Sequence, residues 1–446
     1  MIRVISTGLF VTLLAANLCW SQIGALSTEV YSLDECLKLA EKHNANLISA
    51  KQSYKVAKSQ VWRGWGELLP SLDSDLGYSR TVYGPSVYPT YDPLLGTTTG
   101  TDTSGIRISK SYSTGISARQ SWSLGGYNFY QIKEYNARKK SAESSVALTR
   151  QELILSVKQA YFDVLKAKML LEIQQKALMR ADEQLRIAET RYELGAASYS
   201  DVLKAKVQHG DVKLALIGAQ NSVKLAKATL NSWMGQDVDS PIDVEENLTV
   251  PEFDYLYENA LDRAMNDNPN VRNAESELRS AEATVGMARS GFFPNLNLSG
   301  SYSWGNPELD QLESFLDRDY SWRFSASISL NIFDNFLKNH NLSWSKANRN
   351  SAKEMFHQAK RDVALELKQA FLNVQEAEEK IDLTEKKVAS AQEDLDLMQE
   401  KYNLGAANIL ELLDAEVSFK QAESDQVEAW YDYNLAVAQF EKAIGQ

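Results

Sequence analysis

The stretch 321–332 reads Ser-Trp-Arg-Phe-Ser-Ala-Ser-Ile-Ser-Leu-Asn-Ile, and it decides how the rest of the sequence is interpreted. Its even-numbered residues are apolar and its odd-numbered residues are polar. Because successive side chains of a β-strand point to opposite faces of the sheet, the alternation predicts a strand with one apolar and one polar face. The period alone fits a half-buried strand of a water-soluble sheet as well as a strand of a transmembrane barrel.

Three other stretches alternate in the same way, at 72–78, 112–124 and 296–304, and the first of them is weaker. Ser fills most of the polar positions, and Trp lies toward the strand ends. Transmembrane barrel strands of ~9–11 residues show this pattern, with lipid on one side and water on the other. An export signal and the absence of an apolar spanning helix from the sequence also favour an outer-membrane barrel over a soluble sheet.

Four strands per chain cannot close a barrel. An open sheet edge cannot face lipid, because its backbone amides would lack hydrogen-bond partners. If the strands span a membrane, the chain must therefore form oligomers. Two chains give eight strands and a barrel filled by side chains, whereas three chains give twelve strands and room for a water-filled lumen.

The composition limits the classes of function. The 446 residues carry a net charge of −12 at pH 7, and their mean hydropathy is −0.36. The acidic balance argues against a nucleic-acid partner, and the polarity excludes a bundle of membrane helices. Two cysteines, Cys19 and Cys36, are too few for a disulfide framework or a cysteine metal site. The four histidines show no metal-binding spacing, so we expect no metal and no cofactor.

Residues 1–27 have the features of a signal peptide. Arg3 precedes an apolar stretch at 4–16, which is too short to cross a ~30 Å hydrocarbon layer as a helix. The small residues that follow offer three cleavage positions, after Ser21, Ala25 or Ser27. Cys19 is a candidate lipid-acceptor cysteine, although the residues before it match the usual small-residue box poorly. The signal indicates export from the cytoplasm.

Comparison of the chain with itself reveals two copies of one unit. A shift of 224 residues aligns 36–79 with 260–303, and a shift of 210 aligns 118–235 with 328–445. The first copy thus carries 14 more residues between Ser79 and Ala118, and their Gly, Pro, Thr and Ser content predicts an exposed loop. Each copy is expected to run helix, strand, loop, strand, very long helix, tight turn, helix. We divide the chain into a signal peptide (1–27), a first repeat (28–235), a linker (236–252) and a second repeat (253–446).

Each copy contains a segment without Pro or Gly that predicts a very long helix, at about 130–194 and 336–404. Each would be roughly 95 Å long at 1.5 Å per residue. Small and apolar residues recur there with 4–3 spacing, from Val157 to Tyr192 and from Leu367 to Tyr402, which predicts a coiled-coil seam with closely approaching helices.

Each long helix ends at a turn that the sequence also predicts. Gly195 and Gly405 are placed to adopt the left-handed conformation that ends a helix. Ser198 and Asn408 are placed to cap the next one. We therefore expect two tight helical hairpins whose returning helices are half as long as the long helices. Two half-length helices placed end to end would cover one long partner.

The whole layout resembles the TolC-like outer-membrane efflux family, also called outer membrane factors. The features that carry the resemblance are the doubled helix–strand–strand–long-helix unit, the Leu68-Leu69-Pro70 and Phe292-Phe293-Pro294 entries into strands, and the two Leu-Gly-Ala-Ala turns. The resemblance implies an α+β membrane protein, a homotrimer with a twelve-stranded barrel that continues as a long α-helical coiled-coil barrel. It implies the outer membrane of a Gram-negative bacterium, with the helical part in the periplasm.

The resemblance also implies partners and tip residues. A periplasmic adaptor (membrane fusion) protein would dock at the turns and join the channel to an inner-membrane transporter of RND, ABC or MFS type, with outer-membrane lipid around the barrel. The expected docking residues of the two turns are Leu194, Gly195 and Ala196, and Leu404, Gly405 and Ala406.

Family members close the periplasmic mouth with acidic residues just after the second turn. Glu411 and Asp414 match these positions and lie on one helix face. Threefold repetition would gather six carboxylates around a narrow pore and favour cations. The alternative for Glu411 is a capping role, because Asn408 precedes it by three residues.

Tyr402 and Asp201 match a pair that links neighbouring helices near the closed tip in family members. The alternatives are a core aromatic for Tyr402 and a capping acid for Asp201. The family often has Arg at the position of Ala407, and its absence suggests a differently fastened closed state.

The leading hypothesis is therefore a passive outer-membrane exit duct of a tripartite efflux or type I secretion system. No phosphate-binding glycine loop or nucleophile constellation is present, so we expect no enzyme activity. The alternative is a secreted periplasmic coiled-coil scaffold or adaptor with a soluble sheet. A hydrolase that uses paired carboxylates has little support, because acidic residues on long helices are usually solvated.

Overall fold

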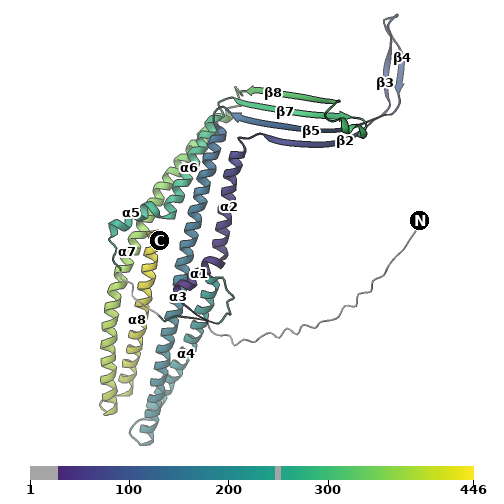
Figure 1. The fold of residues 1–446 in the computed structure, drawn as a ribbon. Helices are drawn as coiled ribbons and strands as arrows, with labels where there is room; N and C mark the ends of the chain where they lie inside the picture. Colours follow the sequence, from purple (N-terminus) through teal and green to yellow (C-terminus); the bar gives the residue numbers. More distant parts are fainter. Residues whose placement is uncertain (1–28, 247–252, 446) are drawn as a thin grey trace, which may run out of the picture.

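The structure is a computed structural model that describes residues 29–246 and 253–445. The predicted signal peptide, the candidate lipid-acceptor Cys19 and part of the predicted linker lie outside these residues. The molecule is elongated, with a β-sheet at one end and long helices that run from it to two hairpin tips (Figure 1). Among the described residues, no helix combines the length and the apolar character needed to cross a membrane.

The four predicted strands are present, and they form one antiparallel sheet in the order β2-β5-β7-β8. The strands are β2 (Ser71–Tyr83), β5 (Arg107–Ser123), β7 (Asn295–Asn306) and β8 (Tyr320–Ser329). The alternation in the sequence continues to residue 332, but β8 ends at Ser329. It ends there because Ser329 pairs with Asn295, the first residue of β7, so the chain beyond it has no partner strand.

The strand register places the apolar residues of all four strands on one face. Tyr302 of β7 pairs with Ile116 of β5 on one side and with Trp322 of β8 on the other. The opposite face is polar, with pairs such as Ser117 with Ser301 and Ser303 with Ser321. Much of the apolar face is open to the surroundings, with Leu76 76% exposed and Phe324 78% exposed, whereas Tyr302 is buried.

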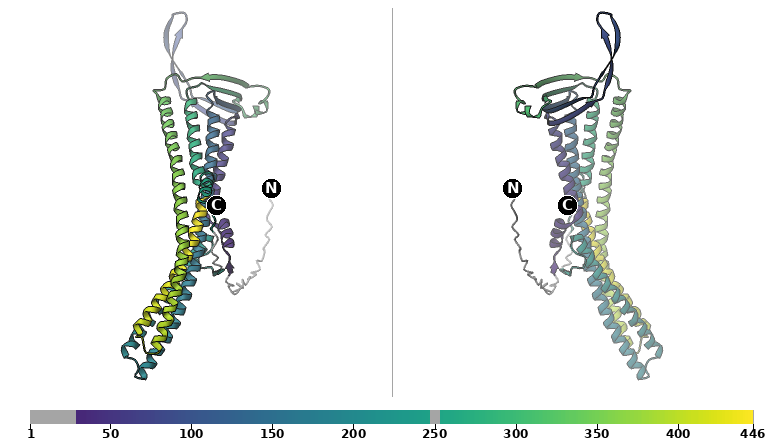
Figure 2. Two further views of the ribbon diagram at one scale, coloured as in Figure 1. Left: turned by 90° about the vertical axis from the view of Figure 1, so that its left-hand side faces the viewer. Right: turned by 90° about the vertical axis from the view of Figure 1, so that its right-hand side faces the viewer.

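The prediction of an exposed loop between Ser79 and Ala118 is wrong. β2 and β5 extend into this interval, and a separate hairpin joins them, formed by β3 (Ser86–Asp92) and β4 (Thr97–Ser104). The Gly and Pro content obscured the Thr, Tyr and Val residues, whose branched or aromatic side chains favour strands. A two-stranded ribbon also tolerates Pro89, because its outer edge needs no backbone donor. The hairpin projects beyond the main sheet (Figure 2).

The single leading helix expected in each copy is divided in two. The first copy has α1 (Leu33–His43) and α2 (Ala45–Gly66), and the second has α5 (Tyr257–Asp267) and α6 (Pro269–Ser290). Asn44 and Asn268 cause the breaks. Each is extended at ψ 124° and 127°, and its side chain accepts hydrogen bonds from the backbone at the start of the next helix.

The long helices α3 (Tyr127–Glu193) and α7 (Leu337–Asn403) have 67 residues each. At 1.5 Å per residue each is about 100 Å long. The returning helices are α4 (Tyr199–Met234) and α8 (Ile409–Ala443). α2 and α4 both pack on α3, and α6 and α8 both pack on α7, so half-length helices cover a long one as predicted. The division into repeats stays a prediction, although the matching helices α1 and α5, α2 and α6, and α3 and α7 have equal lengths.

Three smaller elements complete the description. The predicted linker contains β6 (Ile242–Val244), which pairs in parallel with β1 (Glu29–Tyr31). A short 3-10 helix, η1 (Leu309–Ser314), lies between β7 and β8.

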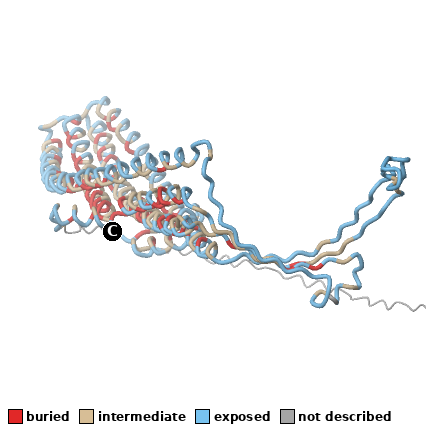
Figure 3. Tube along the Cα trace, turned by 90° about the horizontal axis from the view of Figure 1, so that it is seen from above, coloured by how far each residue is buried: buried red, intermediate tan, exposed pale blue. Residues whose placement is uncertain are grey.

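Most buried residues lie in the helical part (Figure 3). The predicted seam of α7 is buried or partly buried throughout, and its last residue, Tyr402, is 7% exposed. The predicted seam of α3 is buried or partly buried as far as Ala188. Its last residue, Tyr192, is 46% exposed, because its ring lies beside the exposed Tyr199 at the start of α4 instead of in the core. The seam prediction is wrong at that residue.

Candidate functional site

Two hairpin tips form the end of the molecule farthest from the sheet (Figure 1). Gly195 and Gly405 adopt positive φ angles of 73° and 75°, as predicted, and Ser198 and Asn408 cap the returning helices. A Cβ atom built at either glycine meets no atom within 4 Å, so only the backbone conformation requires glycine there. The leucines before the two glycines protrude, with Leu194 78% exposed and Leu404 85% exposed.

Each returning helix begins with a capping box. The Asp201 carboxylate accepts hydrogen bonds from the Ser198 backbone N (3.1 Å) and Oγ (2.8 Å). These bonds favour the charged form and lower the pKa of Asp201. The Glu411 carboxylate accepts a hydrogen bond from the Asn408 backbone N at 3.1 Å. The capping roles considered for Asp201 and Glu411 are therefore present in the structure.

The two candidate gate residues lie on the exposed side of α8. Glu411 and Asp414 are exposed, whereas Leu412 and Ala415, which alternate with them, are buried at 2% and 3%. The structure thus keeps both carboxylates on one open face of the second hairpin. Their role as a gate stays a prediction.

Tyr402 and Asp201 have different partners within one chain. Tyr402 lies in a buried cluster with Val202, Ile409 and Leu412, so its core role is present. Asp201 is engaged by Ser198 and lies 3.7 Å from the Lys204 ammonium. In the described part of the chain, no hydrogen bond joins the Tyr402 and Asp201 side chains.

Arg191 is a tip residue that the sequence analysis missed. From the last turn of α3, its Nη1 donates to the Tyr402 carbonyl oxygen at 2.9 Å and its Nη2 donates to the Asn403 carbonyl oxygen at 3.0 Å. The guanidinium carbon also lies 4.4 Å from the centre of the Tyr402 ring. The available signal was the pair Arg191-Tyr192 in the first copy against Lys401-Tyr402 in the second.

A polar cluster lies deeper in the bundle, between α3 and α8. Gln184 of α3 donates a hydrogen bond to the Glu416 carboxylate of α8. Burial raises the pKa of Glu416 to about 7, and the nearby Arg180 opposes this shift. Arg180 also lies 3.8 Å from the Glu423 carboxylate, whose pKa burial raises as well. The two hairpins are therefore joined here by charged groups that are largely removed from water.

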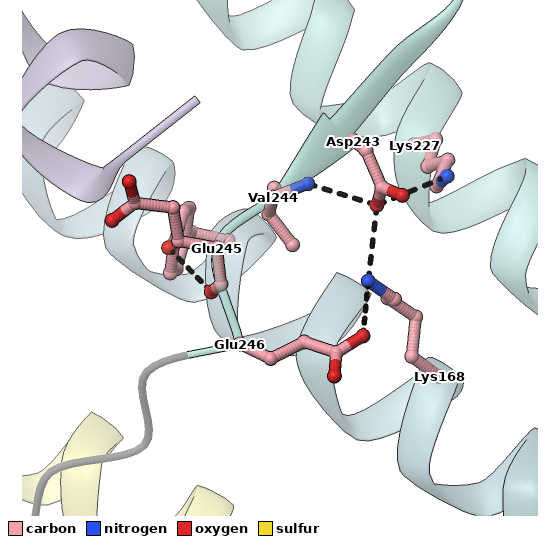
Figure 4. Close-up of polar contacts among 7 residues, drawn as sticks. Lys168, Lys227, Asp243, Val244, Glu245 and Glu246 are labelled. Carbon is pink, nitrogen blue, oxygen red and sulfur yellow. Dashed lines mark hydrogen bonds and ion pairs between the residues drawn. The ribbon is translucent and has the colours of Figure 1, made fainter. Parts of the chain in front are cut away.

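A second polar network lies midway along the helices and fixes β6 (Figure 4). The Asp243 carboxylate accepts from the Val244 backbone N (2.9 Å) and lies between the ammonium groups of Lys168 (3.1 Å) and Lys227 (3.2 Å). Lys168 also contacts Glu246 at 2.6 Å. The hydrogen bonds and the two lysines lower the pKa of Asp243 against the opposing effect of burial. The network ties the predicted linker to α3 and α4.

Possible metal ligands do not gather anywhere in the described part of the chain. Among residues 29–246 and 253–445, no group of three or more His, Cys, Asp or Glu side chains is arranged to hold a metal ion. Cys36 is free and buried, and burial raises the pKa of its thiol to about 12.

The fold and the tips together define a class of protein. A four-stranded sheet that is apolar on one face and polar on the other continues into two helices of about 100 Å, each of which ends in a helical hairpin. This is the architecture of an outer-membrane channel protein with a long helical extension.

Comparison with known proteins gives the family. The profile of the outer membrane efflux protein family matches residues 36–236 and 260–446. The chain therefore belongs to this family. It is 24% identical over 427 residues to the outer membrane protein TolC of Vibrio cholerae, which covers 95% of this chain and 93% of that protein. It is 24% identical over 432 residues to the pyoverdine export outer membrane protein OpmQ of Pseudomonas aeruginosa, which covers 96% of this chain and 85% of that protein.

Solved structures show the same fold. The Campylobacter jejuni CmeC outer membrane channel has a TM-score of 0.81 at 19% identity, over 93% of this chain and 85% of that one. The Vibrio cholerae outer membrane protein VceC has a TM-score of 0.77 at 20% identity, over 93% of this chain and 96% of that one. The resemblance to the TolC-like family is confirmed, and the chain is an outer-membrane protein of a Gram-negative bacterium.

Proposed function

We propose that the chain forms a passive exit duct that carries molecules from the periplasm, or from an inner-membrane pump, to the cell exterior. The observation that carries this proposal is the strand register, which gathers apolar residues on one face of the sheet and Ser, Asn and Asp on the other. Such a sheet suits lipid on one side and water on the other. The duct would catalyse no reaction.

The working assembly is proposed to be a homotrimer. In the part of the chain that the structure describes, β2 and β8 each have one unpaired edge, and an unpaired edge cannot face lipid. Three chains would pair these edges into a twelve-stranded barrel with room for a lumen. The helical part also has surface for a neighbour, because α4 exposes a row of apolar residues: Leu203, Val207, Leu214 and Leu225.

The helical part is proposed to lie in the periplasm and to dock an adaptor protein at its tips. The exposed Leu194 and Leu404, each beside its glycine turn, support docking because protruding apolar side chains mark protein contacts. The adaptor would connect the duct to an inner-membrane transporter of RND, ABC or MFS type. Energy would come from that transporter. Opening would follow from tighter binding of the adaptor to the open tips.

Glu411 and Asp414 are proposed to form an acidic gate at the periplasmic mouth. Their exposure on one face of α8 supports this, because both carboxylates are available to a pore. The capping bond of Glu411 is compatible with the role, because it uses Oε2 and leaves Oε1 to face the pore. Three copies would concentrate negative charge and favour cations.

Tyr402 and Asp201 are proposed to link neighbouring helices in the assembled tip. The capping box occupies Asp201 Oδ2, and among residues 29–246 and 253–445 the one polar partner of the Oδ1 atom is the Lys204 ammonium at 3.7 Å. The Oδ1 atom is thus the acceptor with capacity for such a link.

Planar-bilayer recording of the detergent-purified full-length protein tests the proposal. The wild type should form cation-preferring pores, and the double variant Glu411→Ala, Asp414→Ala should conduct more and prefer cations less. Asp211→Ala, which removes an exposed acid of α4, is the matched control and should behave as wild type. Unchanged currents in the double variant would contradict the gate. Recovery as a soluble periplasmic monomer without pores would contradict the duct.

A further inference from the structure

We propose that Arg191 is a clasp that fastens the end of α7 to the end of α3 and holds the second hairpin in the closed position. The inference rests on the proposed duct and names the side chain of this chain that positions its gate. Arg191 belongs to the first hairpin, whereas Glu411 and Asp414 belong to the second. The clasp would therefore couple the two hairpins of each subunit.

The contacts of Arg191 are unusually complete for a residue at a helix end. Its two terminal nitrogens donate to the carbonyls of Tyr402 and Asn403, the last two residues of α7, at 2.9 and 3.0 Å. The last carbonyl groups of a helix lack an N–H donor within the helix and carry partial negative charge. The Tyr402 carbonyl also accepts from the Gly405 backbone N at 3.1 Å, so Arg191 adds a second donor there and donates to the Asn403 carbonyl as well. The guanidinium also lies over the Tyr402 ring, with its carbon 4.4 Å from the ring centre.

Only an arginine can make this set of contacts from one side chain. The planar guanidinium reaches two adjacent oxygens at once while it faces an aromatic ring. A lysine in its place would keep the charge, but its point-like ammonium lacks the fork geometry. The contact therefore depends on the shape of the side chain as well as on its charge.

The contact is made from the first hairpin to the second and has no counterpart from the second hairpin to the first in the described part of the chain. Lys401 occupies the position in the second copy that Arg191 occupies in the first. Within residues 29–246 and 253–445, the Lys401 side chain makes no hydrogen bond or ion pair. Tyr192, which corresponds to Tyr402, is 46% exposed, whereas Tyr402 is 7% exposed. The first hairpin therefore holds the second through Arg191, and no equivalent contact returns.

The clasp and the gate are joined by packing. Tyr402 shares a buried cluster with Ile409, Leu412 and Ala415 of α8. Leu412 lies between Glu411 and Asp414 in the sequence, and Ala415 follows directly. Because packed side chains move together, a fixed end of α7 sets the position of the first turns of α8. Release of Arg191 would free the turns that carry both carboxylates. Arg191 is thus a positioning residue and does not itself line the gate.

Single-channel recording of the full-length protein in planar bilayers tests the clasp. Arg191→Ala should raise the conductance severalfold and lengthen open events. Arg191→Lys should give an intermediate increase, because the charge stays but one carbonyl contact is lost. Lys401→Ala, the matched control, should conduct as wild type. Arg191→Lys keeps the aliphatic stem and the charge, so its conductance provides the test if Arg191→Ala fails to assemble.

Combination with the gate variant separates positioning from general loosening. If Arg191 acts through the gate, Arg191→Ala should add little conductance to the double variant Glu411→Ala, Asp414→Ala. Wild-type conductance in both Arg191 variants would contradict the proposed role of Arg191. Fully additive effects with the gate variant would contradict it as well. Neither result would contradict the proposed duct. Absence of pores from the wild type would instead contradict the duct itself.

Discussion

The two hairpin tips have the same turn sequence and the same turn geometry but different surroundings. Both contain Leu-Gly-Ala-Ala, both glycines have φ near 74°, and both returning helices begin with a capping box. The two tips differ in the burial of the tyrosine that precedes each turn. Tyr402 is buried under Arg191, whereas Tyr192 is exposed beside Tyr199. Local sequence thus determines the turn, and packing against the other hairpin determines what each tip can do.

The comparison extends along the returning helices. A shift of 210 residues places Lys206 of α4 opposite Glu416 of α8. Lys206 forms an exposed ion pair with Glu189 at 3.1 Å, whereas Glu416 is held by Gln184 inside the bundle. At this position the acid of α8 is therefore engaged by the other hairpin inside the bundle, whereas the base of α4 forms a solvated ion pair within its own hairpin.

The largest difference is expected from removal of the two tyrosine rings. Tyr402→Ala empties a buried site, and loss of a large buried aromatic costs about 3–5 kcal/mol. Tyr192→Ala changes an exposed ring, and surface substitutions cost about 0.5 kcal/mol. Thermal unfolding of the two detergent-purified variants should therefore show a much lower midpoint for Tyr402→Ala. Equal midpoints would mean that the two tips are packed alike.

A smaller effect is expected on the pH dependence of stability, and it arises from Glu416 of the second hairpin. The pKa of Glu416 is about 7 in the folded chain, against an ordinary value of 4.5. Between these values the folded state keeps a proton that the unfolded state has lost, so the free energy of unfolding falls as pH rises through this window. The thermal midpoint of the wild type should fall from pH 4.5 to 7, and Glu416→Gln should flatten this fall. Lys206→Gln is the control and should leave the slope unchanged; a slope that survives Glu416→Gln would contradict the assignment.

The glycine turns should respond equally. Gly195→Ala and Gly405→Ala each place a Cβ in a left-handed conformation with no neighbour within 4 Å. Each should therefore cost about 1–2 kcal/mol through backbone strain alone. Equal shifts of the thermal midpoint would show that the tips differ in packing and not in turn geometry. A markedly larger shift at one glycine would contradict the claim that the two turns are equivalent.

The smallest effect is expected from the capping acids. Asp201→Ala and Glu411→Ala each remove one capping contact, worth about 0.3–1.5 kcal/mol. The lowered pKa of Asp201 means that its contribution is present at neutral pH and is lost as pH falls below its ordinary value of 3.8. The hydrogen-exchange protection factor of the first turn of α4, taken relative to the intrinsic exchange rate at each pH, should fall in acid in the wild type and should be low at every pH in Asp201→Ala. Protection that persists in acid would contradict this role.

Much of the fold could be predicted from sequence because it rests on periodic or local signals. The period-2 pattern of 321–332 gives a strand, and the Pro-free and Gly-free segments give α3 and α7. The positive φ of Gly195 and Gly405 follows from short-range backbone sterics. These features depend on residues close in the chain.

The features that were missed depend on contacts between distant segments or on a composition that misleads. Arg191 contacts residues more than 200 positions away, so no local pattern marks it. The burial that shifts Glu416 likewise arises where α8 packs on α3. Asn44 lies within the aligned repeat 36–79, but the repeat alone does not predict its capping side chain or the resulting helix break. The β3–β4 hairpin was taken for a loop because Gly and Pro outweighed the strand-forming residues.

Electron cryomicroscopy of the detergent-purified full-length protein tests the central claim most directly. The account predicts a threefold tube with twelve strands at one end, in which Arg191 contacts the end of α7 and the α7–α8 tips approach the axis more closely than the α3–α4 tips. A monomer, or a tube in which the α3–α4 tips narrow the mouth, would contradict the account.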